Sequence, residues 1–130
     1  MTMTTIRSLD RFEQKVERKL QLWRGQMARW RGAQAGARFG LGRQVRLLYP
    51  ACFFAGDDVT IDDFGYLHCL STRGVRIGAY SSIDRNAWLH CGGKPGDCEH
   101  GFFEMGEHSY IGAHAVLGAG GGIRIGSHVL

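Results

Sequence analysis

The segment Met105-Gly-Glu-His-Ser-Tyr-Ile111-Gly-Ala-His-Ala-Val-Leu117 decides the fold, because it runs twice through one six-residue pattern. Each unit begins with a large apolar residue, continues with glycine, and has a small residue at its fifth position. Self-similarity at a fixed period indicates a repeat architecture, in which each unit packs on its neighbours. The same pattern is therefore expected over much of the chain.

Thirteen such hexads cover residues 35–130. Eleven of the thirteen first positions are Ile, Leu or Met, and eight of the second positions are Gly. The fifth position is small or valine in every hexad except the first, where it is Phe39. The hexads begin at Ala35, Leu41, Leu47, Ala55, Ile61, Leu67, Ile77, Ile83, Leu89, Met105, Ile111, Leu117 and Ile125.

This pattern predicts an all-β solenoid. Three hexads close one triangular coil, the aliphatic side chains fill its narrow interior, and successive coils pair as parallel strands. Glycine at the second position is expected to permit a positive φ or a tight turn. Extra residues follow Cys52, Thr72, Lys94 and Gly122, always behind a third hexad. One corner of the solenoid should therefore carry every insertion.

Residues 1–34 form a different unit, a basic amphipathic helical arm. Its apolar residues recur at intervals of three or four, with charged residues between them: Leu9, Phe12, Val16, Leu20, Trp23, Met27 and Trp30. Two interpretations stay open. The apolar stripe packs on the rest of the protein or on a sister chain, or the arm makes a peripheral membrane contact through residues 7–31.

The chain is 44% hydrophobic and 22% charged, which indicates a folded domain. Residues 1–46 carry a net charge of +8 and the remainder −4. Such an arm suits an anionic membrane or a phosphorylated lipid-linked substrate. No nucleic-acid partner is expected, since no nucleic-acid-binding motif accompanies the basic residues. We expect a cytoplasmic protein, peripheral at the inner membrane surface if the arm binds lipid, with reduced cysteines.

The segments 77–83 and 105–126 resemble the left-handed β-helix acyltransferases built from hexapeptide repeats. The resemblance is strongest to the maltose, nodulation and exopolysaccharide O-acetyltransferase branch, and it covers about residues 35–130. It implies the left hand of the coil, because parallel crossovers otherwise turn to the right. It also implies a homotrimer that takes acetyl-CoA or another acyl-CoA as co-substrate, with a sugar or lipid-linked glycan as acceptor and no metal.

In that family a histidine on an extended loop is the general base. In the branch with a glycine-rich segment like 118–122, the base follows in the next coil, which here lies beyond Leu130. The chain is therefore expected to bind CoA weakly and to transfer acyl groups poorly. Within the chain, the candidate catalytic residue is His90, which lies near the insertion corner, and the candidate CoA-binding residues are Gly120, Gly121 and Gly122.

Adjacent coils repeat a histidine–cysteine pair, and the insertion of residues 95–104, a predicted projecting lid, adds one residue of each type: His68-Cys69, His90-Cys91, Cys98 and His100. These residues are surface or corner residues, an acyltransferase site with His90 as base, or a metal cluster. The metal interpretation is disfavoured, because the spacing of Cys91, Cys98 and His100 matches no usual zinc pattern.

Two alternatives come from other functional classes. The γ-type carbonic anhydrases use the same solenoid and a His-x4-His zinc motif, whereas His108 and His114 are one residue further apart. A catalytically incomplete solenoid that serves as a scaffold or assembly unit is the other alternative, since a solenoid needs a capping element over its terminal coil.

Overall fold

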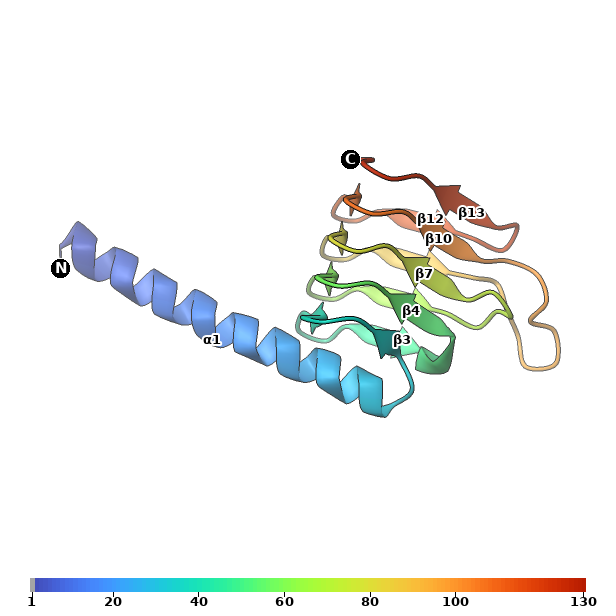
Figure 1. The fold of residues 1–130 in the computed structure, drawn as a ribbon, viewed down its shortest axis with the longest axis horizontal. Helices are drawn as coiled ribbons and strands as arrows, with labels where there is room; N and C mark the ends of the chain where they lie inside the picture. The colour runs from blue at the N-terminus through green and yellow to red at the C-terminus, as the bar shows by residue number, and fades with distance from the viewer. Residues whose placement is uncertain (1) are drawn as a thin grey trace.

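The computed structural model describes residues 2–130, which begin with one long helix, α1 (Met3–Trp30; Figure 1). The Thr2 hydroxyl caps the helix by accepting a hydrogen bond from the Thr5 N–H at 3.2 Å. The predicted amphipathic helix is confirmed, and it extends further toward the N-terminus than the apolar stripe required. No helix within residues 2–130 is both long enough and apolar enough to cross a bilayer.

The rest of the chain forms a solenoid of three parallel sheets, and each sheet receives every third strand. Sheet A contains β1 (Gln34–Ala35), β4 (Phe53–Ala55), β7 (Val75–Ile77), β10 (Phe103–Met105) and β13 (Ile123–Ile125). Sheet B contains β2 (Gly40–Leu41), β5 (Thr60–Ile61), β8 (Ser82–Ile83) and β11 (Tyr110–Ile111). Sheet C contains β3 (Arg46–Leu48), β6 (Tyr66–His68), β9 (Trp88–His90) and β12 (Val116–Gly118). A 3-10 turn, Pro50–Cys52, precedes β4.

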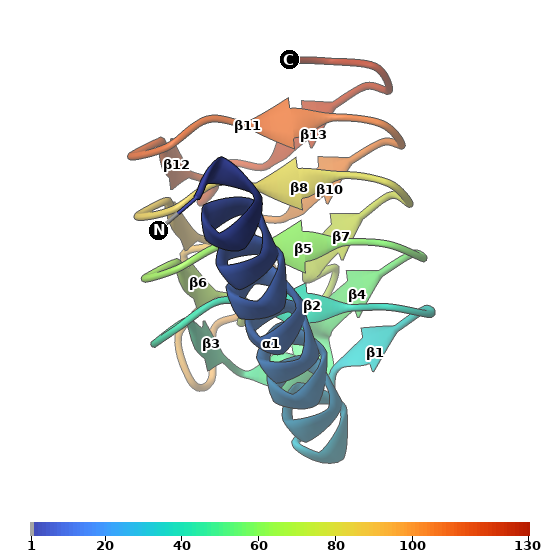
Figure 2. The ribbon, with the colours of Figure 1, turned by 90° about the vertical axis from the view of Figure 1, so that its left-hand side faces the viewer.

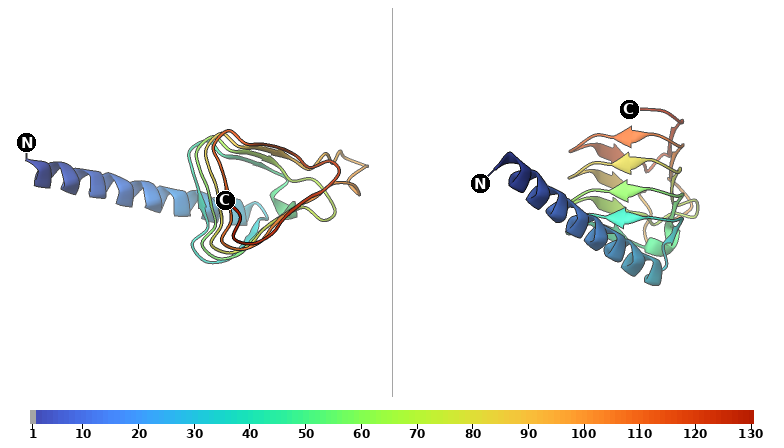
Figure 3. Two further views of the ribbon diagram at one scale, coloured as in Figure 1. Left: turned by 90° about the horizontal axis from the view of Figure 1, so that it is seen from above. Right: turned by 60° about the vertical axis from the view of Figure 1, so that its left-hand side comes forward.

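Every predicted hexad begins within one of these strands, so the six-residue register is confirmed. Equivalent first positions pair directly, and in sheet C they form the column Leu47, Leu67, Leu89 and Leu117. The duplicated segments 61–69 and 83–91 lie one above the other. Seen from above, the chain runs clockwise through sheets A, B and C as it rises toward the viewer (Figure 3). The coil is therefore left-handed, as the resemblance implied.

The core is the narrow interior of the solenoid, filled by the first-position side chains. Small fifth-position residues occupy the corners, where hydrogen bonds link successive coils. The hydroxyl of buried Ser81 donates to the Gly106 carbonyl at 2.9 Å and accepts from the Ser109 N–H at 3.0 Å. Phe39, the exception to the fifth-position rule, is fully buried against Phe53, with ring centroids 5.4 Å apart.

The second-position glycines do not supply the positive φ that the sequence suggested. None of them has a positive φ, which occurs instead at the fourth position, as at Asp58, Tyr80 and Asn86. Each of these left-handed residues donates its N–H to the coil before it, as Tyr80 does to the Asp57 carbonyl at 2.9 Å. Glycine is needed at the second position because the next coil is close. A Cβ on Gly78 would lie 2.5 Å from the Gly106 carbonyl carbon.

The apolar stripe of α1 does not pack on the solenoid, so the expectation of packing within the chain is wrong, and contact with a sister chain or a membrane stays open. Its seven residues remain 41–66% exposed. The helix meets the first coil in front of sheet B through buried Gly25 and Ala28 (Figure 2). Arginines add hydrogen bonds to backbone carbonyls, from Arg24 to Leu41 at 3.3 Å and from Arg29 to Ala35 at 3.4 Å.

All four predicted insertions lie where sheet C leads into sheet A, which we call the C–A corner. The longest of them projects outward from the coils (Figure 1). It is shorter than predicted, because Phe103 and Glu104 belong to β10 and pair with Val75 and Arg76. The insertion therefore ends at Phe102 and leaves a strand of normal length behind it.

Candidate functional site

His68 and His90 lie on the outer face of sheet C, at the ends of β6 and β9 beside the C–A corner. They are paired residues of neighbouring strands, so their imidazoles stack with centroids 4.1 Å apart and an interplanar angle of 5°. Tyr49 lies against His68, with centroids 5.2 Å apart. The strand register thus produces a short aromatic column at this edge of the sheet.

The two histidines have different polar surroundings. The Nδ1 atom of His68 is buried and has no hydrogen-bond partner within the described residues. Burial, and then the nearby His90, hold the pKa of His68 below its usual 6.5, so this ring stays neutral. The Nδ1 of His90 accepts a hydrogen bond from the Gly92 N–H at 2.7 Å, which in a neutral ring leaves the proton on Nε2. Base catalysis by His90 therefore requires release of the Gly92 N–H.

Cys69 and Cys91 point the other way, into the interior, because successive residues of a strand face opposite sides. Burial raises the pKa of Cys69, and it raises that of Cys91 to about 11. Both are therefore thiols near neutral pH, poorly suited as nucleophiles. Each histidine is next to a cysteine in the sequence, but the histidines and the cysteines lie on opposite faces of the sheet.

The glycine-rich turn lies directly above His90 at the same corner. Gly118 pairs with His90 across the sheet, and the Ala119 N–H donates to the His90 carbonyl at 2.8 Å. Gly120 and Gly121 are exposed, with no atom near the position of an added Cβ. The structure thus brings the candidate base together with Gly120, Gly121 and Gly122. Both sets of roles stay predictions.

The projecting loop, residues 92–102, starts beside His90 and ends under the glycine-rich turn. A two-residue turn pairs Lys94 with Asp97 through hydrogen bonds of 2.9 and 2.8 Å. The Cys98 carbonyl accepts from the Thr72 N–H at 2.8 Å, which fixes the loop to the coil below. His100 is exposed and lies outside the stacked pair.

The structure assembles no metal site from the predicted histidines and cysteines. Among residues 2–130, no three His, Cys, Asp or Glu side chains gather in a geometry that could hold a metal ion. His108 and His114 lie in turns that follow different sheets, the first after β10 and the second after β11. They therefore lie at different corners of the solenoid and do not come together within residues 2–130.

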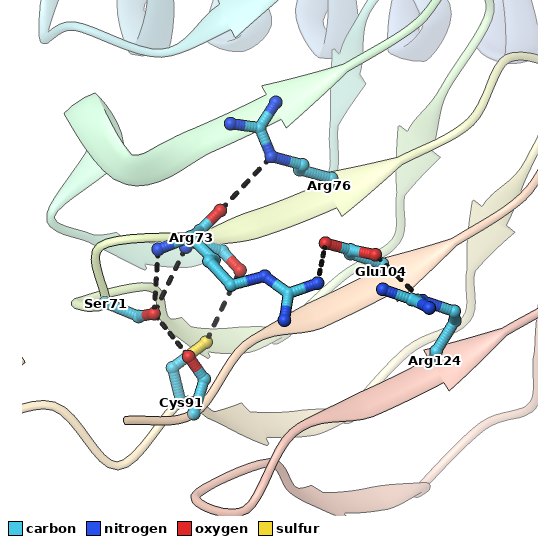
Figure 4. A network of polar contacts seen from close by, with 8 residues as sticks. Ser71, Arg73, Arg76, Cys91, Glu104 and Arg124 are labelled. Atoms are coloured by element: carbon cyan, nitrogen blue, oxygen red, sulfur yellow. Dashed lines mark hydrogen bonds and ion pairs between the residues drawn. The ribbon is translucent and has the colours of Figure 1, made fainter. Parts of the chain in front are cut away.

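A basic groove on sheet A was missed by the sequence analysis. Its volume is about 470 Å³, and its charged side chains come from three successive strands: Arg76, Glu104 and Arg124. Arg73 reaches the same face from the preceding turn and bonds to Glu104 at 2.7 Å (Figure 4). Arg124 binds the other oxygen of Glu104 at 3.1 Å.

Two phenylalanines lie on this side of the solenoid: Phe54 lines the groove, and Phe102 lies against Arg73 beside it. The Arg73 guanidinium lies 3.5 Å from the centroid of Phe102, and the Arg76 guanidinium lies 4.1 Å from that of Phe54. Arg73, and then Arg124, hold the pKa of Glu104 below its usual range, so its carboxylate is charged at neutral pH. This single negative charge lies among the positive charges of Arg73, Arg76 and Arg124. The groove is therefore cationic. The charged residues of the groove face outward at paired positions of neighbouring strands. They are 20 or more residues apart in the sequence, so the column that they form can be recognised only from the strand register.

Comparisons of this chain with protein-family models, with curated proteins and with solved structures found no match. The fold therefore rests on the hexad register and the three interleaved sheets.

Proposed function

We propose that this chain is an acyl-CoA-dependent O-acyltransferase, with acetyl as the acyl group and a sugar or a cell-envelope polysaccharide precursor as acceptor. The basic groove on sheet A is the observation that carries this proposal. Acyl-CoA combines several phosphates with an adenine ring, and the groove offers three guanidinium groups beside two phenylalanine rings. Guanidinium binds phosphate through two parallel hydrogen bonds, and aromatic rings stack on bases.

The glycine-rich turn and His90 supply the remaining parts of the proposed site. Exposed backbone at Gly120 and Gly121 lets a ligand approach closely, because no side chain intervenes. Once the Gly92 N–H has released Nδ1, His90 takes the proton of the acceptor hydroxyl, whose oxygen bonds to the thioester carbon while the carbon–sulfur bond breaks. The proton then passes to the leaving sulfur. Such general-base help typically contributes about 10²–10⁴-fold in rate.

A scaffold or assembly unit without catalysis is the second candidate. The hydrogen bond from the Gly92 N–H to Nδ1 of His90 favours it, because this bond occupies the nitrogen that a base would need. The two candidates differ in whether CoA binds and turns over.

Calorimetry with CoA, and thiol release from acetyl-CoA in the presence of sugar acceptors, distinguish them. Arg76→Gln should weaken CoA binding about tenfold or more, since it removes a charge-assisted bond. Arg85→Gln is the matched control, because this exposed arginine follows β8, away from the groove. His90→Gln should abolish turnover and leave CoA binding intact. If CoA does not bind, or Arg85→Gln weakens it equally, the acyltransferase proposal fails and the scaffold role stands.

A further inference from the structure

The outer face of α1 is a continuous apolar surface that nothing within residues 2–130 covers. Seven large apolar residues form it, and we call them the apolar stripe: Leu9, Phe12, Val16, Leu20, Trp23, Met27 and Trp30. The two tryptophans touch edge to face, with centroids 5.4 Å apart. A contiguous apolar patch on this scale marks a protein or membrane contact.

The stripe faces away from the solenoid. Gly25 and Ala28 are the buried residues of the helix, and Trp23 and Met27 each lie two positions from Gly25, close to the opposite side at about 100° per residue. The whole solenoid lies to one side of the helix axis (Figure 1). A flat surface can therefore contact the full length of the stripe without meeting the solenoid.

The cations of the helix divide into two groups. One group, Arg18, Arg24 and Arg29, donates hydrogen bonds to backbone carbonyls of the first coil. The others are exposed and take part in no ion pair within residues 2–130: Arg7, Arg11, Lys15 and Lys19. Glu17, one of only three acids in the helix, is neutralised by Arg24 at 3.2 Å and Arg43 at 3.4 Å. The accessible surface of the helix is thus apolar and basic.

These features fit a membrane better than a second copy of the helix. The stripe has two successive intervals of four, from Phe12 to Val16 to Leu20, which interrupts the alternating three–four repeat of a coiled coil. In a parallel pair centred on Trp23, Lys19 of one helix would face Arg24 of the other, two like charges. Residues 3–16 are all exposed, so packing within the chain does not stabilise that half of the helix.

We propose that α1 lies in the surface of an anionic phospholipid bilayer. The apolar stripe enters the boundary between headgroups and acyl chains, Trp23 and Trp30 sit at headgroup depth, and the free cations contact lipid phosphates. The solenoid stays in the water above it. This attachment is independent of the acyltransferase proposal, because no residue of the stripe belongs to the C–A corner or to the basic groove.

Sedimentation of the full chain with vesicles tests the proposal, with the blue shift of tryptophan emission as a second measurement. Vesicles of phosphatidylglycerol and phosphatidylcholine in equal amounts should bind the chain, and pure phosphatidylcholine should bind it more weakly. The double substitution Leu9→Ser and Phe12→Ser should reduce binding about tenfold or more, since both side chains leave the bilayer. Lys15→Gln with Lys19→Gln should reduce binding to the anionic vesicles alone, by about fivefold per charge.

Phe64→Ser is the matched control, because Phe64 is a half-exposed phenylalanine on the solenoid. It should leave vesicle binding unchanged. Loss of binding with Phe64→Ser, or retention with the Leu9 and Phe12 substitutions, overturns the proposal. So does a chain that ignores vesicles but loses its oligomeric state with the same two substitutions, because the stripe would then join copies of the protein.

Discussion

A methyl group added to Gly78 would lie 2.5 Å from the carbonyl carbon of Gly106 and 2.6 Å from the amide nitrogen of Glu107. Both atoms belong to the backbone of the next coil, so neither can rotate away. The same position in the hexad that begins at Ile111 is Gly112, where an added methyl group would meet only the Tyr110 ring, at 4.0 Å. Gly78 and Gly112 occupy the same position of the hexad, but only Gly78 is packed closely against the backbone of the next coil.

We predict that Gly78→Ala destabilises the fold by about 1–3 kcal/mol, the usual cost of overpacking. Gly112→Ala should change the free energy of unfolding by less than about 0.5 kcal/mol, as open surface sites do. Urea denaturation of the two variants measures both values. Equal losses would mean that glycine acts through its own backbone freedom and not through the neighbouring coil.

Among the elements, the projecting loop combines exposure with few ties to the solenoid. Residues 94–97 and 99–100 are exposed, and Cys98 contacts the coil below through its backbone carbonyl, which accepts from both the N–H and the hydroxyl of Thr72. The side chains at the tip of the loop therefore add little to the packing of the fold.

Replacement of residues 95–100 by a Gly/Ser linker of equal length should cost less than about 1 kcal/mol of stability. We expect the same change to weaken CoA or acceptor binding, because a lid excludes water from a site through its side chains. Thermal unfolding and calorimetry check the two outcomes. A variant that unfolds would show that the loop is a structural element, and unchanged binding of both ligands would exclude the lid.

The sequence predicts the strands well and the contacts of the helix poorly, for physical reasons. One aliphatic residue in six is a local signal, so hexads such as the one at Ile83 can be located without the structure. The contact face of α1 has no such signal, because it consists of Gly25, Ala28 and hydrogen-bonding arginines. The apolar stripe was visible, but its exposure depends on where the first coil lies.

The candidate site divides in the same way. His90 lies 28 residues before Gly118, where the glycine-rich turn begins. The hexad pattern was enough to predict that the two lie at the same corner. The basic groove needed the register of sheet A, whose insertions of unequal length obscure the column of Arg76, Glu104 and Arg124. The Gly92 hydrogen bond to His90 arises from loop geometry that no repeat encodes.

At the scale of the whole molecule, sheet C has an apolar outer column that suits association. Trp88 is 40% exposed and stacks over Tyr66, and its strand partner Val116 is 74% exposed. Flat sheets with such columns pack side by side, and the family resemblance implies three copies around an axis.

We therefore predict a homotrimer, for which light scattering at micromolar concentration should give three times the mass of the chain. Val116→Glu should shift it toward monomer, because three carboxylates would enter an apolar contact. Tyr80→Glu, an exposed aromatic residue at another corner, is the control and should leave the trimer intact. A monomeric wild-type chain would contradict the trimer.

The pairing of Ala55 with Ile77, and of Ile77 with Met105, means that one circuit of the solenoid takes 22 residues in one place and 28 in the next. The cross-section is set by side-chain size and cannot vary, whereas the length of the prism can. Excision of residues 55–76 would join Phe54 to Ile77, and every later side chain would keep its position in the repeat, one coil lower. A deletion of one or two residues inside a hexad would turn core residues toward water. We therefore expect this protein to tolerate insertions and deletions of whole coils, or length changes at the C–A corner, but not length changes inside a hexad.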